Sequence, residues 1–265
     1  MGGTVPSLSR TAVFIHGAWV TDLCWEKFSL FFKERGYRTL APPWPHKDRS
    51  VEEIRRDPSA LAGLGVAEIV DHYERIVRAE LKPPLLVGHS FGGLFVQMLL
   101  DRGLGAAGVA IHPAPPRWVP VTQWTSIRAN LGVLTTWGGW RKVVRMSFPQ
   151  FQYAFVNGLA EAEQRAAYDR YVVPETGRIF FESGLQSPAT GVNFKNSKRA
   201  PLLITAGGED HIVPVSLNRS NFRRYAGSGA VTDFQEFPGL RHWVIAEPGW
   251  EEVAEHVTAW FERQA

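Results

Sequence analysis

Short runs of aliphatic and β-branched residues alternate along the chain with longer segments in which apolar residues recur every three or four positions. The first pattern predicts buried strands and the second predicts amphipathic helices. The predicted strands cover residues 11–17, 37–44, 84–88, 106–113, 200–210 and 231–239. The predicted helices cover residues 24–36, 65–81, 91–103, 216–227 and most of 250–263. Strands separated by helices predict an α/β fold, with a mainly parallel sheet and helices on both of its faces.

Residues 117–199 break this alternation, because they contain no run typical of a parallel strand. They include helical stretches such as residues 161–172 and four of the ten tryptophans, Trp118, Trp124, Trp137 and Trp140. We predict a mostly helical cap at 117–199, inserted into a core made of residues 1–116 and 200–265. Ligands of open α/β sheets bind at the carboxyl ends of the strands. An insertion after the predicted strand 106–113 would cover that edge.

Composition narrows the class of protein further. A chain of 265 residues with 45% hydrophobic residues can bury roughly three-quarters of its unfolded surface. The net charge is +3, and Lys and Arg are interspersed with Asp and Glu, which gives little reason to expect nucleic acid as a partner. Cys24 is the only cysteine, so no intramolecular disulfide is possible. Residues 1–10 lack the apolar run of a signal peptide, and no membrane span is evident, so we expect a cytoplasmic protein.

The segment LLVGHSFGGL, residues 85–94, places Ser90 between Gly88 and Gly92, after a predicted strand and before a predicted helix. A strand that turns directly into a helix strains the turn residue and leaves little room for side chains two positions away. In this context the pattern G-x-S-x-G predicts a nucleophile elbow. The start of the helix would direct the Phe91 N–H toward charge that develops beside Ser90. An ordinary glycine–serine turn is the alternative interpretation.

A serine nucleophile needs a base to accept its proton. Of the eight histidines, His242 is the candidate, because it follows the last predicted strand and would reach the same edge as Ser90. We expect His16 to orient a loop by hydrogen bonding. The sequence does not decide whether His112, at the end of a strand, touches the substrate pocket. The base needs an orienting acid, for which we choose Asp210, after the strand at 200–210. Its neighbour Glu209 is the alternative.

The chain order of serine, acid and histidine at Ser90, Asp210 and His242 is that of the α/β-hydrolases. Together with the segment VFIHGAW, residues 13–19, it makes the chain resemble the α/β-hydrolase superfamily. The resemblance covers about residues 11–115 and 200–263, and is strongest to the compact branch that includes plant methyl esterases and hydroxynitrile lyases.

This resemblance implies a sheet of about six strands. It also implies that the residue after His-Gly, here Ala18, supplies the second oxyanion N–H beside that of Phe91, and that Trp19 lines the pocket. Gly17 and Arg241 differ from the residues usual in hydroxynitrile lyases, which favours ester chemistry.

We therefore predict a serine carboxylesterase for hydrophobic or aromatic esters, acting on a small molecule through an acyl-enzyme. Trp124, Trp137 and Trp140 of the cap are predicted to line the pocket with Trp19, because tryptophan offers a large apolar face. No metal or cofactor is expected. A lactonase, a cofactor-free perhydrolase or haloperoxidase, and a ligand-binding receptor that reuses the fold are the alternatives. The natural ester and the oligomeric state stay open.

Overall fold

A computed structural model of the protein describes residues 9–264. Its central sheet has six strands in the order β2-β1-β3-β4-β7-β8, and every neighbouring pair is parallel. These strands are β1 (Thr11–Ile15), β2 (Arg38–Leu40), β3 (Leu85–His89), β4 (Ala107–Ile111), β7 (Leu202–Gly207) and β8 (Thr232–Phe237). The predicted fold class and the expected number of strands are confirmed.

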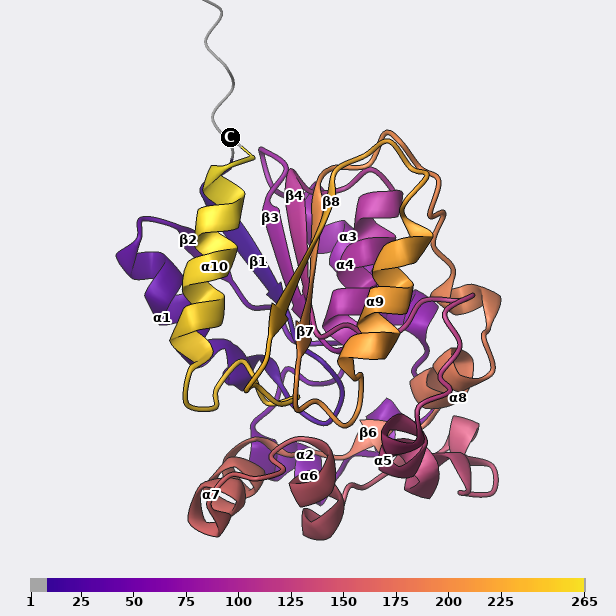
Figure 1. Ribbon diagram of the computed structural model, residues 1–265. Coiled ribbons are helices and arrows are strands. Elements are labelled where there is room, and N and C mark those ends of the chain that lie inside the picture. The colour runs from indigo at the N-terminus through magenta and orange to yellow at the C-terminus, as the bar shows by residue number, and fades with distance from the viewer. Residues whose placement is uncertain (1–8, 265) are drawn as a thin grey trace, which may run out of the picture.

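Helices cover both faces of the sheet, as Figure 1 shows. One face carries α1 (Glu26–Glu34) and α10 (Trp250–Glu262), and the other carries α3 (Val66–Arg78), α4 (Phe91–Asp101) and α9 (Val215–Arg224). The apolar positions that predicted α3 are the ones it buries, among them Val66, Ile69, Val70, Tyr73 and Val77. The helix is therefore stabilised by burying its apolar side against the sheet.

Most strands are shorter than the sequence pattern indicated. The predicted ranges of these strands included proline or glycine residues at their ends, and these residues do not pair with a neighbouring strand. The short helix α2 (Val51–Arg56) was not predicted. Its six residues span fewer than two helical turns, which is too short to show a repeating apolar pattern. Its start carries a capping box in which Ser50 and Glu53 bond each other's backbone N–H.

Most of the segment between β4 and β7 lies against the carboxyl ends of the strands, below the sheet in Figure 1, and its last residues return to the start of β7. It contains α5 (Trp124–Leu134), η3 (Gly139–Arg141), β5 (Val143–Val144), α6 (Phe148–Ala154), α7 (Glu161–Tyr171), β6 (Glu175–Thr176), α8 (Arg178–Gly184) and η4 (Pro188–Thr190). Strands β5 and β6 form a small antiparallel pair, which two-residue strands could not reveal in the sequence. We refer to residues 117–199 as the cap.

Within residues 9–264, no helix combines the length and the apolar character that crossing a bilayer requires. The expectation about a signal peptide concerns residues 1–10, of which 1–8 lie outside the described residues.

Candidate active site

Ser90 occupies the turn between β3 and α4 in a strained backbone conformation. Its φ is 57° and its ψ is −121°, which is unusual for a residue with a side chain. The turn is held by a hydrogen bond from the Ser90 N–H to the Ile111 carbonyl oxygen at 3.0 Å. A Cβ on Gly88 would lie 2.1 Å from the Gly92 oxygen, and a Cβ on Gly92 would lie 2.0 Å from the Ile15 oxygen. Both glycines are therefore required for the helix to start this close to two strands.

The loop after β1 touches this turn. A Cβ on Gly17 would lie 2.7 Å from the Ser90 Cβ, so the loop can approach the serine only through a glycine. The next residue, Ala18, lines the same pocket as Ser90 and Phe91. Neither the Ala18 N–H nor the Phe91 N–H donates a backbone hydrogen bond within residues 9–264. Two free donors beside a serine are the arrangement that an oxyanion hole needs.

The cap holds the residue that follows Ala18 by both of its backbone groups. The Trp19 N–H donates to Glu175 Oε2 at 3.1 Å, and the Val173 N–H donates to the Trp19 oxygen at 2.8 Å. Trp19 itself has a φ of 71°, so the loop turns sharply at this point. Its ring packs on that of Phe180 in α8, with centroids 5.1 Å apart. The backbone that carries the Ala18 N–H is thus fixed by the cap.

The carboxylate of Glu175 is paired with Lys47 in a completely buried ion pair, with Nζ 2.6 Å from Oε2. Lys47 Nζ also donates to the Val20 oxygen at 2.9 Å, which adds a second attachment to the same loop. Burial lowers the pKa of Lys47, and the attraction of Glu175 opposes that effect. The sequence analysis did not identify this pair, because its two members are 128 positions apart.

His16 fixes the start of the loop, as the sequence suggested. Its Nδ1 lies 2.8 Å from the Gly17 oxygen, and its Nε2 lies 3.2 Å from the Trp44 backbone nitrogen. An Nδ1–H donor and an Nε2 acceptor satisfy both contacts, so the neutral ring fits. Burial, followed by the charge of Lys47, holds the pKa of His16 well below its ordinary value.

Asp210 and His242 meet at the same edge of the sheet. Asp210 follows β7, His242 follows β8, and His242 Nδ1 lies 2.7 Å from Asp210 Oδ2. The other carboxylate oxygen, Oδ1, accepts the N–H groups of Ile212 and Val213 at 2.8 and 2.9 Å. Both side chains are buried, whereas Glu209 is exposed. The geometry therefore gives Asp210, rather than Glu209, the position of an orienting acid.

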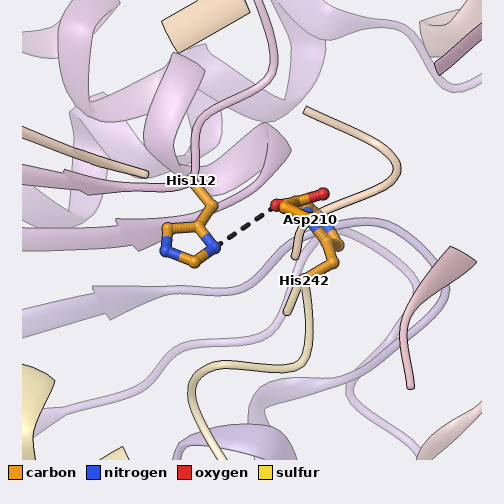
Figure 2. A group of neighbouring side chains, drawn as sticks. All are labelled: His112, Asp210 and His242. Carbon is orange, nitrogen blue, oxygen red and sulfur yellow. Dashed lines mark hydrogen bonds and ion pairs between the residues drawn. The ribbon is translucent and has the colours of Figure 1, made fainter. Parts of the chain in front are cut away.

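A second imidazole faces the same carboxylate oxygen. His112 Nδ1 lies 3.3 Å from Asp210 Oδ2, and Figure 2 shows the two joined, with His242 beside them. His112 directly follows β4 and has a φ of 43°, which directs the chain out of the sheet. Within residues 9–264, neither of its ring nitrogens has a well-aligned hydrogen bond. The sequence left this residue open, and the structure locates it at the acid.

These contacts set the charges of the group. Burial favours the neutral acid, but the two facing imidazoles, His242 first, outweigh burial and hold the pKa of Asp210 far below its ordinary value. Burial lowers the pKa of His112 despite the nearby carboxylate. We therefore interpret the cluster as one ionised carboxylate beside a neutral His112 at neutral pH. His112, Asp210 and His242 are also types that ligate metals. At 2.7 Å the His242–Asp210 contact is a hydrogen bond, and the expectation of no metal stays a prediction.

The second ring nitrogen of His242 is not used in a structural hydrogen bond among the described residues. Its Nε2 forms no hydrogen bond within the described part of the chain. The Phe155 ring packs edge-on against the imidazole, with centroids 4.9 Å apart, and Phe155 lines the pocket together with Ser90. The His242 carbonyl oxygen lies 2.7 Å from His89 Nε2, which fixes the loop. A ring nitrogen without a partner, on an imidazole that packs against a pocket residue, is what a general base requires.

The pocket between the sheet edge and the cap has a volume of about 160 Å³. Its polar side chains are Ser90, Ser126, Asn130 and Ser183, and none of its lining residues is charged. The remainder of the lining is apolar, with Trp19, Phe91, Phe155 and Phe180 as its aromatic members.

The cap tryptophans lie elsewhere. Trp124, Trp137 and Trp140 are exposed to solvent and are absent from the pocket lining, unlike Trp19. The expectation that they line the pocket therefore needs correction. Helix α5 presents Ser126, Ile127 and Asn130 to the cavity and turns Trp124 away from it.

Comparisons with known proteins agree with this fold. A non-heme haloperoxidase of Rhodococcus erythropolis is 26% identical over 252 residues, covering 88% of this chain and 85% of that protein. A monoacylglycerol lipase of Paleococcus ferrophilus has a TM-score of 0.65 at 20% identity, covering 96% of this chain and 95% of the other. A methylesterase from Arabidopsis has a TM-score of 0.63 at 13% identity, with coverages of 94% and 98%.

The structural neighbours thus include the plant methylesterases that the sequence resembled. A family model described as the alpha/beta hydrolase family matches residues 12–256. The chain belongs to the alpha/beta hydrolase family.

Proposed function

We propose that the protein is a serine carboxylesterase. The observation that carries the proposal is the position of Ser90, strained at the start of α4 with the free N–H groups of Ala18 and Phe91 in the same pocket. The hydrogen-bonded pair of Asp210 and His242 at the same sheet edge supplies an oriented base.

The roles follow from this geometry. Ser90 Oγ attacks the ester carbonyl while His242 accepts its proton at Nε2, and Asp210 holds the imidazole through Nδ1–H. The N–H groups of Ala18 and Phe91 bind the developing oxyanion. His242 then returns the proton to the leaving alcohol, and water hydrolyses the acyl-enzyme by the same route.

The lining of the pocket supports hydrophobic or aromatic esters as substrates. A cavity without charged lining residues leaves a charged acyl group unpaired and desolvated, whereas it gains from each apolar group that it encloses. The similarity to a monoacylglycerol lipase and a methylesterase agrees with an ester substrate.

A second candidate is a perhydrolase, which the similarity to a non-heme haloperoxidase favours. Hydrogen peroxide would then replace water in attacking the acyl-enzyme, releasing a peracid and regenerating the Ser90 hydroxyl. The two candidates share Ser90 and differ in the acceptor. Adding peroxide to the ester assay and measuring peracid therefore separates them.

The test of the proposed function is Ser90→Ala with Ser126→Ala as its matched control. Both serines are buried and line the pocket, but Ser126 lies on α5 of the cap, whereas Ser90 lies in the turn between β3 and α4. We expect Ser90→Ala to lower kcat by about 10⁴–10⁶-fold on p-nitrophenyl esters from acetate to decanoate, with Ser126→Ala close to the parent. An organophosphate should label Ser90 and no other residue. Labelling elsewhere, or equal loss in both variants, rejects this mechanism.

A further inference from the structure

The outer side of the cap exposes apolar side chains that the pocket does not use. Trp137 is 87% exposed, Trp124 is 70% exposed and Leu131 is 47% exposed. Trp124 and Leu131 lie seven positions apart on α5, with Arg128 between them, so the three share one side of the helix. A surface helix normally carries polar residues on that side. Helix α5 instead lines the pocket with one side and presents apolar residues to the surroundings with the other.

The segment that follows α5 in the chain exposes two more tryptophans, Trp137 and Trp140. Trp140 packs edge-on against Phe181 of α8, with ring centroids 5.6 Å apart, and α8 supplies Phe180 and Ser183 to the cavity. Lys142 Nζ donates to the Trp137 oxygen at 2.7 Å, so a cation lies beside the most exposed tryptophan. We call Trp124, Leu131, Trp137 and Trp140 the outer cap face.

The charge of this region is one-sided, unlike that of the chain as a whole. Residues 102–160 contain no Asp or Glu. They contain five Arg and one Lys, of which Arg128, Arg141, Lys142 and Arg145 are exposed. Within the described residues none of these four forms an ion pair. The acidic residues of the cap begin at Glu161 in α7, at the other end of the cap from α5 in Figure 1.

We propose that the outer cap face docks on an anionic lipid surface, with Trp124, Leu131 and Trp137 entering the interface and the surrounding Arg and Lys side chains facing the lipid headgroups. Tryptophan favours the boundary between lipid and water, where its ring is buried and its N–H stays hydrated. Each nearby basic residue adds attraction to anionic lipid. Docking of this kind places the wall of the substrate cavity against the phase in which hydrophobic esters dissolve.

A second copy of the chain would fit this face less well. Two copies related by a twofold axis bring identical patches together, so the unpaired cations would face one another. Like charges that meet across an interface cost free energy, whereas the same charges gain on an anionic surface. The docking also stands independently of the reaction, because it uses none of the residues assigned to ester cleavage.

The test measures binding to vesicles of phosphatidylglycerol mixed with phosphatidylcholine, by sedimentation of the full chain. All variants carry Ser90→Ala, so that binding is measured without turnover. We expect the parent to bind these vesicles, to bind pure phosphatidylcholine more weakly, and to lose binding at high salt.

Trp137→Ser and Arg141→Glu should each weaken binding by about tenfold. Their matched controls are Leu81→Ser and Lys82→Glu, which change exposed residues on the loop before β3, at the opposite edge of the sheet, and should leave binding unchanged. The proposal is overturned if the parent does not bind the vesicles, or if the control variants weaken binding as much as the cap variants do. It is also overturned if neither cap variant weakens binding. So does a cap-dependent dimer in lipid-free solution, measured by sedimentation equilibrium, because a second copy would then occupy the face.

Discussion

The sheet edge that carries Ser90, Asp210 and His242 differs from the outer cap face in how it surrounds the same kinds of residue. Around the edge, Trp44 is buried against His16 with ring centroids 4.9 Å apart, and its indole N–H donates to the His16 oxygen at 3.1 Å. On the cap, Trp137 is almost fully exposed. Acids differ in the same manner, since Asp210 is enclosed by donors while its neighbour Glu209 faces solvent.

This contrast indicates that the two regions have different roles. Polar and aromatic groups at the sheet edge are held by several partners each, which fixes the geometry that a reaction needs. Side chains on the outer cap face have few partners within the chain and are available to a surface outside it. Substitutions should therefore affect fold and chemistry at the edge, and binding on the cap.

The largest difference should come from the adjacent acids. Asp210→Asn keeps the shape of the side chain but replaces an acceptor oxygen with a donor, so the imidazole loses the partner that holds its tautomer. We expect kcat to fall by up to about 10⁴-fold, whereas Glu209→Gln should change it little. Steady-state kinetics on one p-nitrophenyl ester measure both. A larger loss in Glu209→Gln would transfer the role of the acid to Glu209.

Stability should separate the two tryptophans. Trp44→Ala removes a fully buried ring and leaves a cavity, so we expect the free energy of unfolding to fall by about 3–5 kcal/mol. Trp137→Ala removes an exposed ring and should change it by less than about 0.5 kcal/mol. Urea titration followed by circular dichroism measures both. Similar losses in the two variants would mean that the outer cap face is part of the folded core.

The smallest effect should come from His112, whose imidazole faces the carboxylate of Asp210. In His112→Phe the carboxylate loses one of the two imidazoles that hold its pKa down, so the pKa of Asp210 should rise toward its ordinary value. The acid limb of the kcat/KM profile should therefore move to higher pH, by up to about one unit. His112→Asn retains a donor and should restore part of the parent profile. Unchanged acid limbs in both variants, even with lower kcat, would give His112 a packing role alone.

Much of this arrangement could be predicted from the sequence, because local patterns determine it. The apolar runs identified the strands, and the two glycines around Ser90 identified the turn, because the pattern G-x-S-x-G between a strand and a helix can be read within one short segment. Asp210 and His242 could be proposed because each follows a predicted strand, and parallel strands end at one edge.

Other features could not be predicted, because they depend on contacts between distant segments. His112 contacts Asp210 at a point where its backbone has a φ of 43°. No residue pattern in the sequence indicates that conformation. The orientation of α5 could not be predicted from the sequence either. Apolar residues occur on both of its sides, so the period of the helix did not indicate which side covers the pocket, and Trp124 was assigned to the wrong one.

The buried pair of Lys47 and Glu175 limits how this enzyme can exchange parts with its relatives. Grafting the cap of another chain onto this core would have to preserve this contact. Here the core supplies the lysine and the cap supplies the carboxylate. A graft without an acid at this position would leave a buried, uncompensated charge, which costs about 3–5 kcal/mol, and would release the Trp19 N–H beside the oxyanion donor. A chimera built from this chain should therefore contain both residues of the pair or neither of them.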